Sequence, residues 1–363
     1  MRALVSLVLA AAVIAPPLRA QGVDPHVTVT VGTATARRGE RVYGTLAVPS
    51  ASDSGTTIQL AIVNGAKPGP VVAFISGSHG TEYTSIVAMT RLIARIDPAK
   101  LRGTAIVVPL LNVASFERMV PHVNPVDGKG MNASYPGDAN GTQTQRVLAA
   151  VAREIVAQSD VVVDLHGGDL DEDLRPYSYW IRTGNAAQDS ASRALALAFG
   201  LDMIIVNDVD VTSAASTRTL SGYALSQGKT TFVAEAGHSG LVTPAETAML
   251  VNGSLSVLGA LKMIDRPSKP AVKISWVGAD QRVRADGGGM FYATAARGSV
   301  VKQGQKVGYV TDYVGRPAGD VLAPQAGVVS FIRGVPSLSR GATMVTVTRQ
   351  LPGGPAAWKK PAP

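Results

Sequence analysis

Continuous apolar runs alternate with stretches of helical periodicity through most of the chain. Runs that are apolar at every position are typical of strands buried on both faces of a parallel sheet, and strands that alternate with helices indicate an α/β fold. We therefore predict a mostly parallel sheet flanked by helices. The predicted strands are 71–75, 104–112, 161–166, 203–206 and 230–234, and the predicted helices are 83–96, 142–158, one around 222–227, and 244–263.

The pattern changes near the segment Pro267–Pro270. Residues 271–349 carry only short β runs separated by glycine-rich turns, without helical periodicity. We predict a smaller C-terminal all-β domain over 271–349, joined by a proline-marked linker to an α/β domain over 21–266. The proline-rich tail 350–363 is predicted to be disordered.

The N-terminus has the pattern of a secretory signal peptide over residues 1–20. Arg2 provides the basic start, residues 3–15 are apolar, and residues 16–20 lead to a small-residue cleavage site at Ala20. The apolar run is too short for a transmembrane helix, which needs about twenty residues. The sequence therefore predicts an exported protein, periplasmic or secreted, that is not inserted in a membrane once the signal is removed.

Composition narrows the chemistry. The chain has no cysteine, which excludes disulfides, thiolate nucleophiles and cysteine-ligated zinc. The net charge of +8 falls by two when Arg2 and Arg19 leave with the signal peptide. The basic residues are scattered and do not form the aromatic-interleaved patch that nucleic-acid binding requires, so we expect no nucleic-acid partner and only a mild attraction to anionic molecules.

Candidate metal ligands stand where two predicted strands end. His79 and Glu82 follow strand 71–75 and open helix 83–96, where a spacing of three residues places them on one helix face. His166 closes strand 161–166. Two histidines and one glutamate form a catalytic zinc ligand set with an open fourth position.

Each of these motifs is weak alone, because a histidine at a strand end is more often a hydrogen-bonded structural residue. Neighbouring features of the sequence strengthen the prediction of a metal site. The chain has only five histidines, and both His79 and His166 are followed directly by glycine. A third predicted strand, 230–234, ends at Glu235. Because open α/β sheets bind ligands at the carboxyl ends of their strands, we expect these side chains to meet at one edge.

Four ordered motifs together resemble the succinylglutamate desuccinylase/aspartoacylase family, the acyl-amino-acid branch of the zinc carboxypeptidase fold. They are Gly77–Glu82, Asp127–Gly137, Asp164–Gly168 and Glu235–Gly237. The resemblance implies a zinc carboxypeptidase-like fold, with Zn²⁺ on His79, Glu82 and His166 and with Glu235 as general base. It also implies that the C-terminal β domain caps the site and narrows substrate entry.

One position departs from the family pattern. The family loop reads close to Asn-Arg-x-Phe-Pro-Gly, and its Asn-Arg pair holds the substrate carboxylate, whereas this chain keeps Asn132 but has Ala133 in the arginine position. We expect Asn132 to bind substrate. A methyl group cannot replace a bidentate guanidinium contact, so recognition of the carboxylate is left open. The family's upstream oxyanion-stabilising arginine is matched by either Arg118 or His122, and the sequence does not decide between them.

The sequence thus favours an exported zinc-dependent hydrolase that cleaves an amide bond of a small N-acyl amino acid or related amide. Two alternatives are a carboxypeptidase-like peptidase and a catalytically inactive exported binding protein of the same fold. A serine hydrolase using Ser239 beside His238 fits poorly, since Gly237–Gly240 lacks the Gly-x-Ser-x-Gly elbow. The sequence identifies neither the acyl group nor the amine, gives no oligomeric state, and does not exclude another divalent ion.

Overall fold

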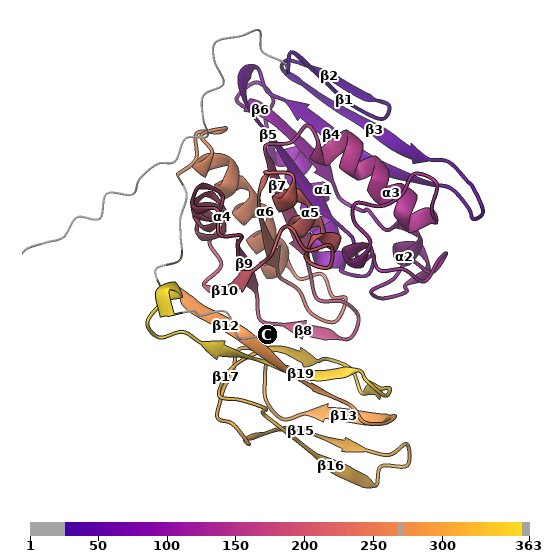
Figure 1. Cartoon of the computed structure of the whole chain (residues 1–363), viewed down its shortest axis with the longest axis vertical. Coiled ribbons are helices and arrows are strands. Elements are labelled where there is room, and N and C mark those ends of the chain that lie inside the picture. Colours follow the sequence, from indigo (N-terminus) through magenta and orange to yellow (C-terminus); the bar gives the residue numbers. More distant parts are fainter. Residues whose placement is uncertain (1–25, 268–270, 272, 358–363) are drawn as a thin grey trace, which may run out of the picture.

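The computed structural model of this protein describes residues 26–267, 271 and 273–357 (Figure 1). The predicted signal peptide over residues 1–20 therefore lies outside the described residues. Within the described part of the chain, no helix is both long and apolar enough to cross a membrane.

A single sheet forms the centre of the α/β part. Its strands run in the spatial order β10-β9-β11-β7-β5-β6-β4-β3. Their bounds are β3 Glu40–Val48, β4 Thr56–Asn64, β5 Lys67–Ser76, β6 Arg102–Val108, β7 Val161–His166, β9 Tyr177–Arg182, β10 Met203–Asp208 and β11 Thr230–Glu235. The pairs β11-β7, β7-β5, β5-β6 and β9-β10 are parallel, whereas β11-β9, β6-β4 and β4-β3 are antiparallel. This largely parallel centre confirms the predicted fold class.

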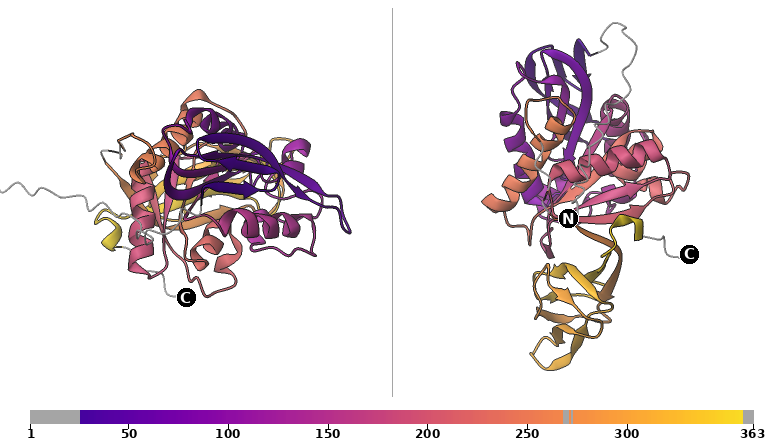
Figure 2. Two further views of the ribbon diagram at one scale, coloured as in Figure 1. Left: turned by 90° about the horizontal axis from the view of Figure 1, so that it is seen from above. Right: turned by 90° about the vertical axis from the view of Figure 1, so that its left-hand side faces the viewer.

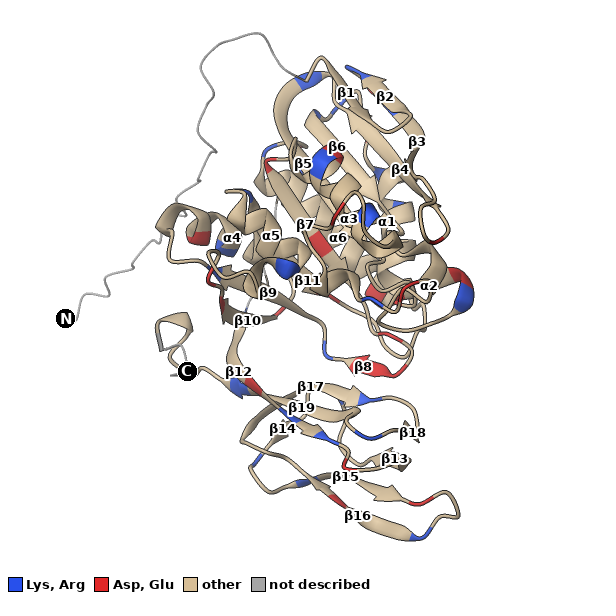
Figure 3. Ribbon diagram, turned by 45° about the vertical axis from the view of Figure 1, so that its right-hand side comes forward, with Lys and Arg blue, Asp and Glu red and all other residues tan. Residues whose placement is uncertain are grey.

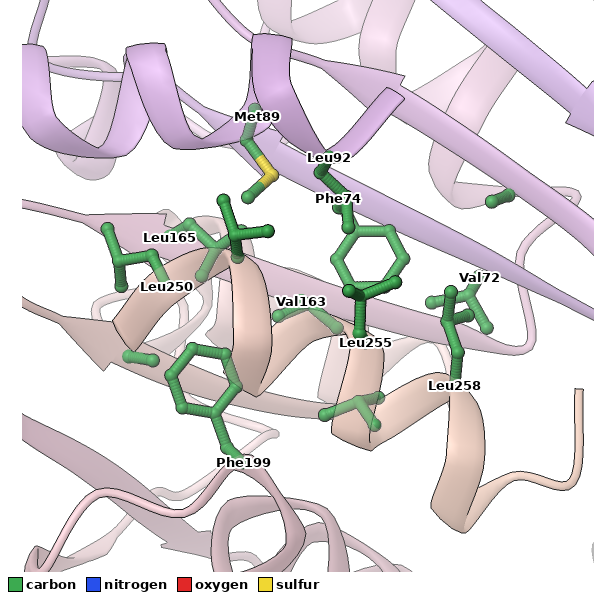
Figure 4. Close-up of a cluster of buried hydrophobic side chains, with 14 of the residues drawn as sticks. Val72, Phe74, Met89, Leu92, Val163, Leu165, Phe199, Leu250, Leu255 and Leu258 are labelled. Atoms are coloured by element: carbon green, nitrogen blue, oxygen red, sulfur yellow. The ribbon is translucent and has the colours of Figure 1, made fainter. Parts of the chain in front are cut away.

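Helices cover both faces of the sheet (Figures 1 and 2). Helices α1 (Tyr83–Arg95), α4 (Ala186–Phe199) and α6 (Pro244–Ala260) pack on one face, and α3 (Gln143–Val151) and α5 (Leu220–Ser226) on the other. Side chains of β5 alternate between the two: Val72 and Phe74 belong to the first core, and Ala73 to the second. Figure 4 shows Phe74 packed between α1 and α6.

Shorter elements complete this part. A π-helical turn (Ala152–Val156) continues α3, and a hairpin of β1 (Thr28–Val31) and β2 (Ala34–Arg37) joins the second core. Helix α2 (Val113–Arg118) opens the long connection between β6 and α3. The Asn112 side chain caps α2 by accepting from Ser115 N, so even this glycine- and proline-rich connection begins with a helix.

The C-terminal strands extend the same sheet. β12 pairs in parallel with β10 and antiparallel with β19, and β17 and β14 follow. A separate sheet has the order β16-β15-β13-β18. Their bounds are β12 Ser275–Arg284, β13 Gly289–Ala293, β14 Val300–Val301, β15 Lys306–Thr311, β16 Pro317–Leu322, β17 Gly327–Arg333, β18 Ser337–Leu338 and β19 Thr343–Gln350. Because β12 belongs to the central sheet, the division into domains 21–266 and 271–349 stays a prediction.

The acidic segment after β7 joins the two parts of the chain. Strand β8 (Glu172–Leu174) pairs with β17. Figure 3 shows β8, coloured red for its acidic residues, between the α/β part and the C-terminal strands. Asp171 bonds Arg333 at 2.8 Å, and Asp173 lies 3.2 Å from Arg297. The arginine partners of Asp171 and Asp173 therefore come from the C-terminal part of the chain.

Several elements differ from the predicted pattern. β8, β9 and α4 within residues 172–199 were not predicted. Strand β8 is acidic, and β9 mixes serine and arginine with its aromatic residues. In the predicted disordered tail, Leu351 is buried and its N–H donates to Trp276 O at 2.8 Å, and a 3₁₀ turn spans Pro355–Ala357. Residues 358–363 of that tail lie outside the described residues.

The packing predicts a large stability difference between two phenylalanines. Phe74 is fully buried, whereas Phe116 on α2 is 39% exposed. We expect Phe74→Ala to lower the free energy of unfolding by about 3–5 kcal/mol, because it leaves a cavity between sheet and helices. Phe116→Ala should change it by less than about 1 kcal/mol. Equal losses in urea denaturation would contradict this assignment of the core.

Candidate active site

The candidate site forms where three neighbouring parallel strands end. The strands lie in the order β11-β7-β5 and run in the same direction. Glu235 at the end of β11 pairs in register with His166 at the end of β7. The loop after β5 carries His79 and Glu82, the latter as the N-cap of α1. Parallel pairing thus brings together residues that are far apart in the sequence.

Two glycines permit the close approach of these loops. A Cβ added to Gly80 would meet Phe116 N at 2.3 Å, and one added to Gly168 would meet Glu172 O at 2.6 Å. Any larger residue at either position would push the neighbouring backbone segment away. The glycines that follow the two histidines therefore bring the strand-end loops into contact.

Glu82 lies between the two imidazoles. Its Oε1 is 2.5 Å from His79 Nδ1, and its Oε2 is 2.9 Å from His166 Nδ1. The same Oε2 accepts from Gly167 N at 2.9 Å. Candidate ligand atoms of all three side chains lie within 4.8 Å of one another. Glu82 and His166 are buried, while His79 keeps 22% side-chain exposure, so the cluster opens on the side of His79.

The electrostatics favour an ionised carboxylate beside charged imidazoles. Burial works to raise the pKa of Glu82, but His166 and His79 hold that pKa well below its usual range. Burial opposes the charge on His166, yet Glu82 and Asp164 raise the pKa of this imidazole well above normal. A buried carboxylate needs such positive partners. A divalent cation could take over this role, because it would attract the same side chains.

The environment of His166 fits a metal ligand. Asp164 Oδ1 is buried, lies 3.1 Å from His166 Nε2, and has no hydrogen-bond partner with good geometry within the described part of the chain. If a cation held Nδ1, the ring proton would remain on Nε2 and face this oxygen. Histidine ligands of metals are commonly oriented by a carboxylate in this way. The donor set His79, Glu82 and His166 therefore fits zinc.

Glu235 lies beside the cluster with a tyrosine partner. Tyr177, on the neighbouring β9, donates its phenol proton to Glu235 Oε2 at 2.7 Å. Burial raises the pKa of Glu235, and the negative charge of Glu82 adds to this rise. Tyr177 was not predicted as a site residue, because no strand was predicted at the position of β9. The alternating tyrosines Tyr177 and Tyr179 were the sequence feature that could have indicated this strand.

A second carboxyl group near the cluster, that of Glu172, was also not predicted as a site residue. Burial raises the pKa of Glu172 to about 8, with a further contribution from the carboxylate of Glu82. The acidic run around it suggests a solvated surface, whereas the structure pairs β8 with β17 and bonds Ser239 N to Glu172 O. Glu172 lines the same cavity as the candidate ligands.

Asn132 faces His166, whereas position 133 does not reach the site. The amide nitrogen of Asn132 lies 3.0 Å from His166 Nε2, and its Oδ1 is buried without a partner among the described residues. Asn132 lines the cavity. Ala133 is exposed and is not among the described lining residues.

The structure separates the two oxyanion candidates. The His122 ring stands edge-on to that of His79, with centroids 5.9 Å apart, and lines the cavity. A hydrogen bond from the His122 ring to the Asp171 carboxylate raises the pKa of His122 to about 9, so this imidazole carries a positive charge at neutral pH. Arg118 ends α2 and is absent from the described lining residues. Of the two, His122 is therefore the one in position to meet a substrate.

One cavity of about 1070 Å³ connects these residues with the C-terminal strands. Its inner end holds the candidate ligands, Glu235 and His122. The opposite wall comes from β12, β17 and β19, so both parts of the chain enclose the same space. Such a space holds a small molecule rather than a long chain.

The chain matches a known catalytic domain and a named deacetylase. Residues 68–261 match the sequence model of the Succinylglutamate desuccinylase/Aspartoacylase catalytic domain, over more than half of the chain. A protein of Halomonas elongata named N-alpha-acetyl-L-2,4-diaminobutyric acid deacetylase is 28% identical over 286 residues, which cover 77% of this chain and 82% of the relative.

Solved structures share the fold. The succinylglutamate desuccinylase/aspartoacylase of Rhodobacter sphaeroides is 24% identical with a TM-score of 0.76, covering 86% of this chain and 95% of the other. The product-bound ectoine utilization protein EutE (DoeB) of Ruegeria pomeroyi is 22% identical with a TM-score of 0.77, covering 85% and 95%. Together with the matched catalytic domain, which carries the four motifs, these findings place the chain in the succinylglutamate desuccinylase/aspartoacylase family.

Proposed function

We propose that this protein is an exported zinc-dependent hydrolase that removes the acyl group from a small N-acyl amino acid or related amide. The observation that carries the proposal is the cluster of His79, Glu82 and His166 at the inner end of a cavity that also holds Glu235. Family membership and the named activity of the Halomonas elongata relative, a deacetylase of an N-acetylated diamino acid, support the same reaction class.

His79, Glu82 and His166 would hold the zinc ion. When bound, zinc supplies a Lewis acid that polarises the scissile carbonyl and lowers the pKa of a coordinated water to near 7. The protein's own part is to fix these side chains: Gly167 N–H donates to the Glu82 carboxylate, and Asp164 lies against Nε2 of His166. This support keeps the ligand atoms in place before substrate arrives.

Glu235 would act as the general base and then as the general acid. Its carboxylate takes a proton from the attacking water and later gives it to the leaving amine. Burial raises its pKa towards the pH at which it must work, and Tyr177 fixes one oxygen by a 2.7 Å hydrogen bond. The other oxygen is left for proton transfer.

The enclosing C-terminal strands favour a small substrate. β12 and β19 form part of the cavity wall opposite the cluster, so an extended peptide would need to pass between two parts of the chain that are joined by β8 and β17. An N-acyl amino acid fits the cavity whole. This enclosure distinguishes the proposed deacylase from a carboxypeptidase-like enzyme that must admit a longer chain.

Metal content tests the zinc assignment. We expect about one zinc per chain in the purified mature protein, lost in His166→Ala because one of three ligands is removed. His26→Ala, which changes a histidine outside the cavity, should retain the metal. Elemental analysis by mass spectrometry gives the stoichiometry, and wild-type protein that takes up no zinc on reconstitution would overturn the proposal.

Substitution of Glu235 separates chemistry from metal binding. Glu235→Gln should lower kcat by about 100-fold or more, because the amide cannot carry the proton, while zinc content stays unchanged. Glu117→Gln, at an exposed position on α2, is the matched control and should leave kcat within about twofold. Steady-state hydrolysis of a panel of N-acetyl and N-succinyl amino acids provides the measurement. A Glu235→Gln enzyme of normal kcat would exclude this residue as the base.

Export is the remaining part of the proposal and rests on the pattern of residues 1–20. Expression of the full chain in a bacterial host should give a mature protein in the periplasm or medium that has lost these residues. N-terminal sequencing and intact mass identify the cleavage. Retention of Met1 on protein confined to the cytoplasm would contradict export and leave the proposed reaction untouched.

A further inference from the structure

The cavity has an arginine-lined wall opposite the candidate metal cluster. Among the residues that the structure describes, the arginines lining it are Arg282, Arg284 and Arg333, and all three belong to the C-terminal strands. The family's arginine beside Asn132 is replaced here by Ala133, which is exposed outside the cavity. Any guanidinium that meets a substrate in this cavity therefore comes from the opposite wall.

Strand β12 carries charged side chains at the cavity. Gly278, Ala279, Asp280, Arg282 and Arg284 of this strand line it. The register with β19 shifts before Asp280 and after Val283, and between these shifts Asp280 and Arg282 are alternate residues on one face. On the neighbouring β19, Thr346 is the register partner of Arg282 and lines the same space. One face of this strand pair thus forms the wall.

The three arginines differ in how many of their N–H groups already donate to atoms of the protein. Arg333 bonds Asp171 at 2.8 Å and donates to the carbonyls of Thr343 and Ser337, both at 3.0 Å. Its side chain is only 9% exposed. These contacts hold the C-terminal strands against the acidic segment, so Arg333 is a structural cation.

Arg282 is available for a ligand. Its Nε donates to Asp280 Oδ2 at 3.0 Å, and the two side chains are 53% and 45% exposed. An exposed pair of this kind is worth little and exchanges readily with a competing anion. Burial works to lower the pKa of Arg282, but the carboxylate of Asp280 raises it. Strand β12 pairs with β10, and β10 pairs with β9, the strand that carries Tyr177.

The charges of the cavity orient an anionic substrate. Carboxyl groups of Glu82, Glu172 and Glu235 lie together with the imidazoles of the candidate cluster. At the β12 wall, Arg282 and Arg284 stand beside one carboxylate, Asp280. A substrate carboxylate that replaces Asp280 at Arg282 would be held at this wall, with its amide directed toward the cluster.

From these observations we propose that Arg282 binds the carboxylate of the N-acyl amino acid substrate from the C-terminal strands, in place of the arginine that is missing beside Asn132. The inference rests on the proposed deacylase function and adds the residue that recognises the carboxylate of the substrate. Arg284, two residues further along β12, also lines the cavity and adds positive charge there.

A pair of substrates isolates the carboxylate. The zinc-loaded protein is first assayed with a panel of N-acetyl and N-succinyl amino acids. The best substrate is then compared with its decarboxylated analogue. For Nα-acetyl-2,4-diaminobutyrate this analogue is N-acetyl-1,3-diaminopropane. Wild-type enzyme should hydrolyse the carboxylate form with a kcat/KM about 10- to 100-fold higher, the range of a charge-assisted hydrogen-bonded pair.

Substitutions assign that preference to one side chain. Arg282→Ala should lose the 10- to 100-fold advantage, mainly through KM, and should hydrolyse the decarboxylated analogue as well as wild type does. Arg282→Lys should restore part of it, since lysine keeps the charge without the planar fork. Arg349→Ala is the charge-matched control and should keep the preference for the carboxylate form. Arg349 follows Thr348 on β19. Because Thr348 lines the cavity, Arg349 points to the other face.

The outcomes separate the two proposals. Hydrolysis of neither substrate by the zinc-loaded protein would overturn the proposed function, and the carboxylate site with it. Equal kcat/KM for both substrates, or a preference that survives Arg282→Ala, would overturn the carboxylate site alone. A loss for both substrates in Arg282→Ala would assign this arginine a structural role and also contradict the inference. Isothermal titration of the free amino acid product into wild type and Arg282→Ala gives a second readout that does not depend on turnover.

Discussion

The site depends on one buried carboxylate held between two imidazoles. Glu82 is 2% exposed and bonds the Nδ1 atoms of His79 and His166 through separate oxygens. Burying such a charge is costly unless positive partners surround it. The partners come from two strands, so this arrangement forms only when β5 and β7 pair in the correct register. A shift of one residue would turn His166 to the other face of the sheet, so the geometry of the whole sheet decides whether the cluster exists.

Much of this site could be predicted because its residues occupy ends of strands that the sequence marks strongly. The apolar runs before His79, His166 and Glu235 predict buried parallel strands, and parallel neighbours share one carboxyl edge. Tyr177 could not be found in this way. It belongs to β9, which is antiparallel to β11 and follows an acidic segment without apolar periodicity. Strand pairing beyond the local pattern decides where it lies.

The C-terminal strands illustrate a second limit of sequence reasoning. Their β character could be predicted from short runs and turn glycines, but their attachment could not. The parallel pairing of β12 with β10 and the bonds of Arg333 and Arg297 to the acidic segment are contacts between distant parts of the chain. The acidic residues alone suggest a solvated surface. Their partners make this segment the junction between the two parts of the chain.

That junction also explains how one cavity can contain separate sites for chemistry and for recognition. The strand ends of the central sheet collect the carboxylates and imidazoles that a cation and a proton transfer need. In the proposed arrangement the carboxylate of the substrate is bound at another wall, where β12 presents Arg282 beside Asp280. Sheet continuity from β10 to β12 fixes the distance between the two walls. Recognition and chemistry are therefore coupled through a continuous sheet, and a residue absent beside Asn132 can be replaced by one on a different strand without disturbing the cluster around Glu82.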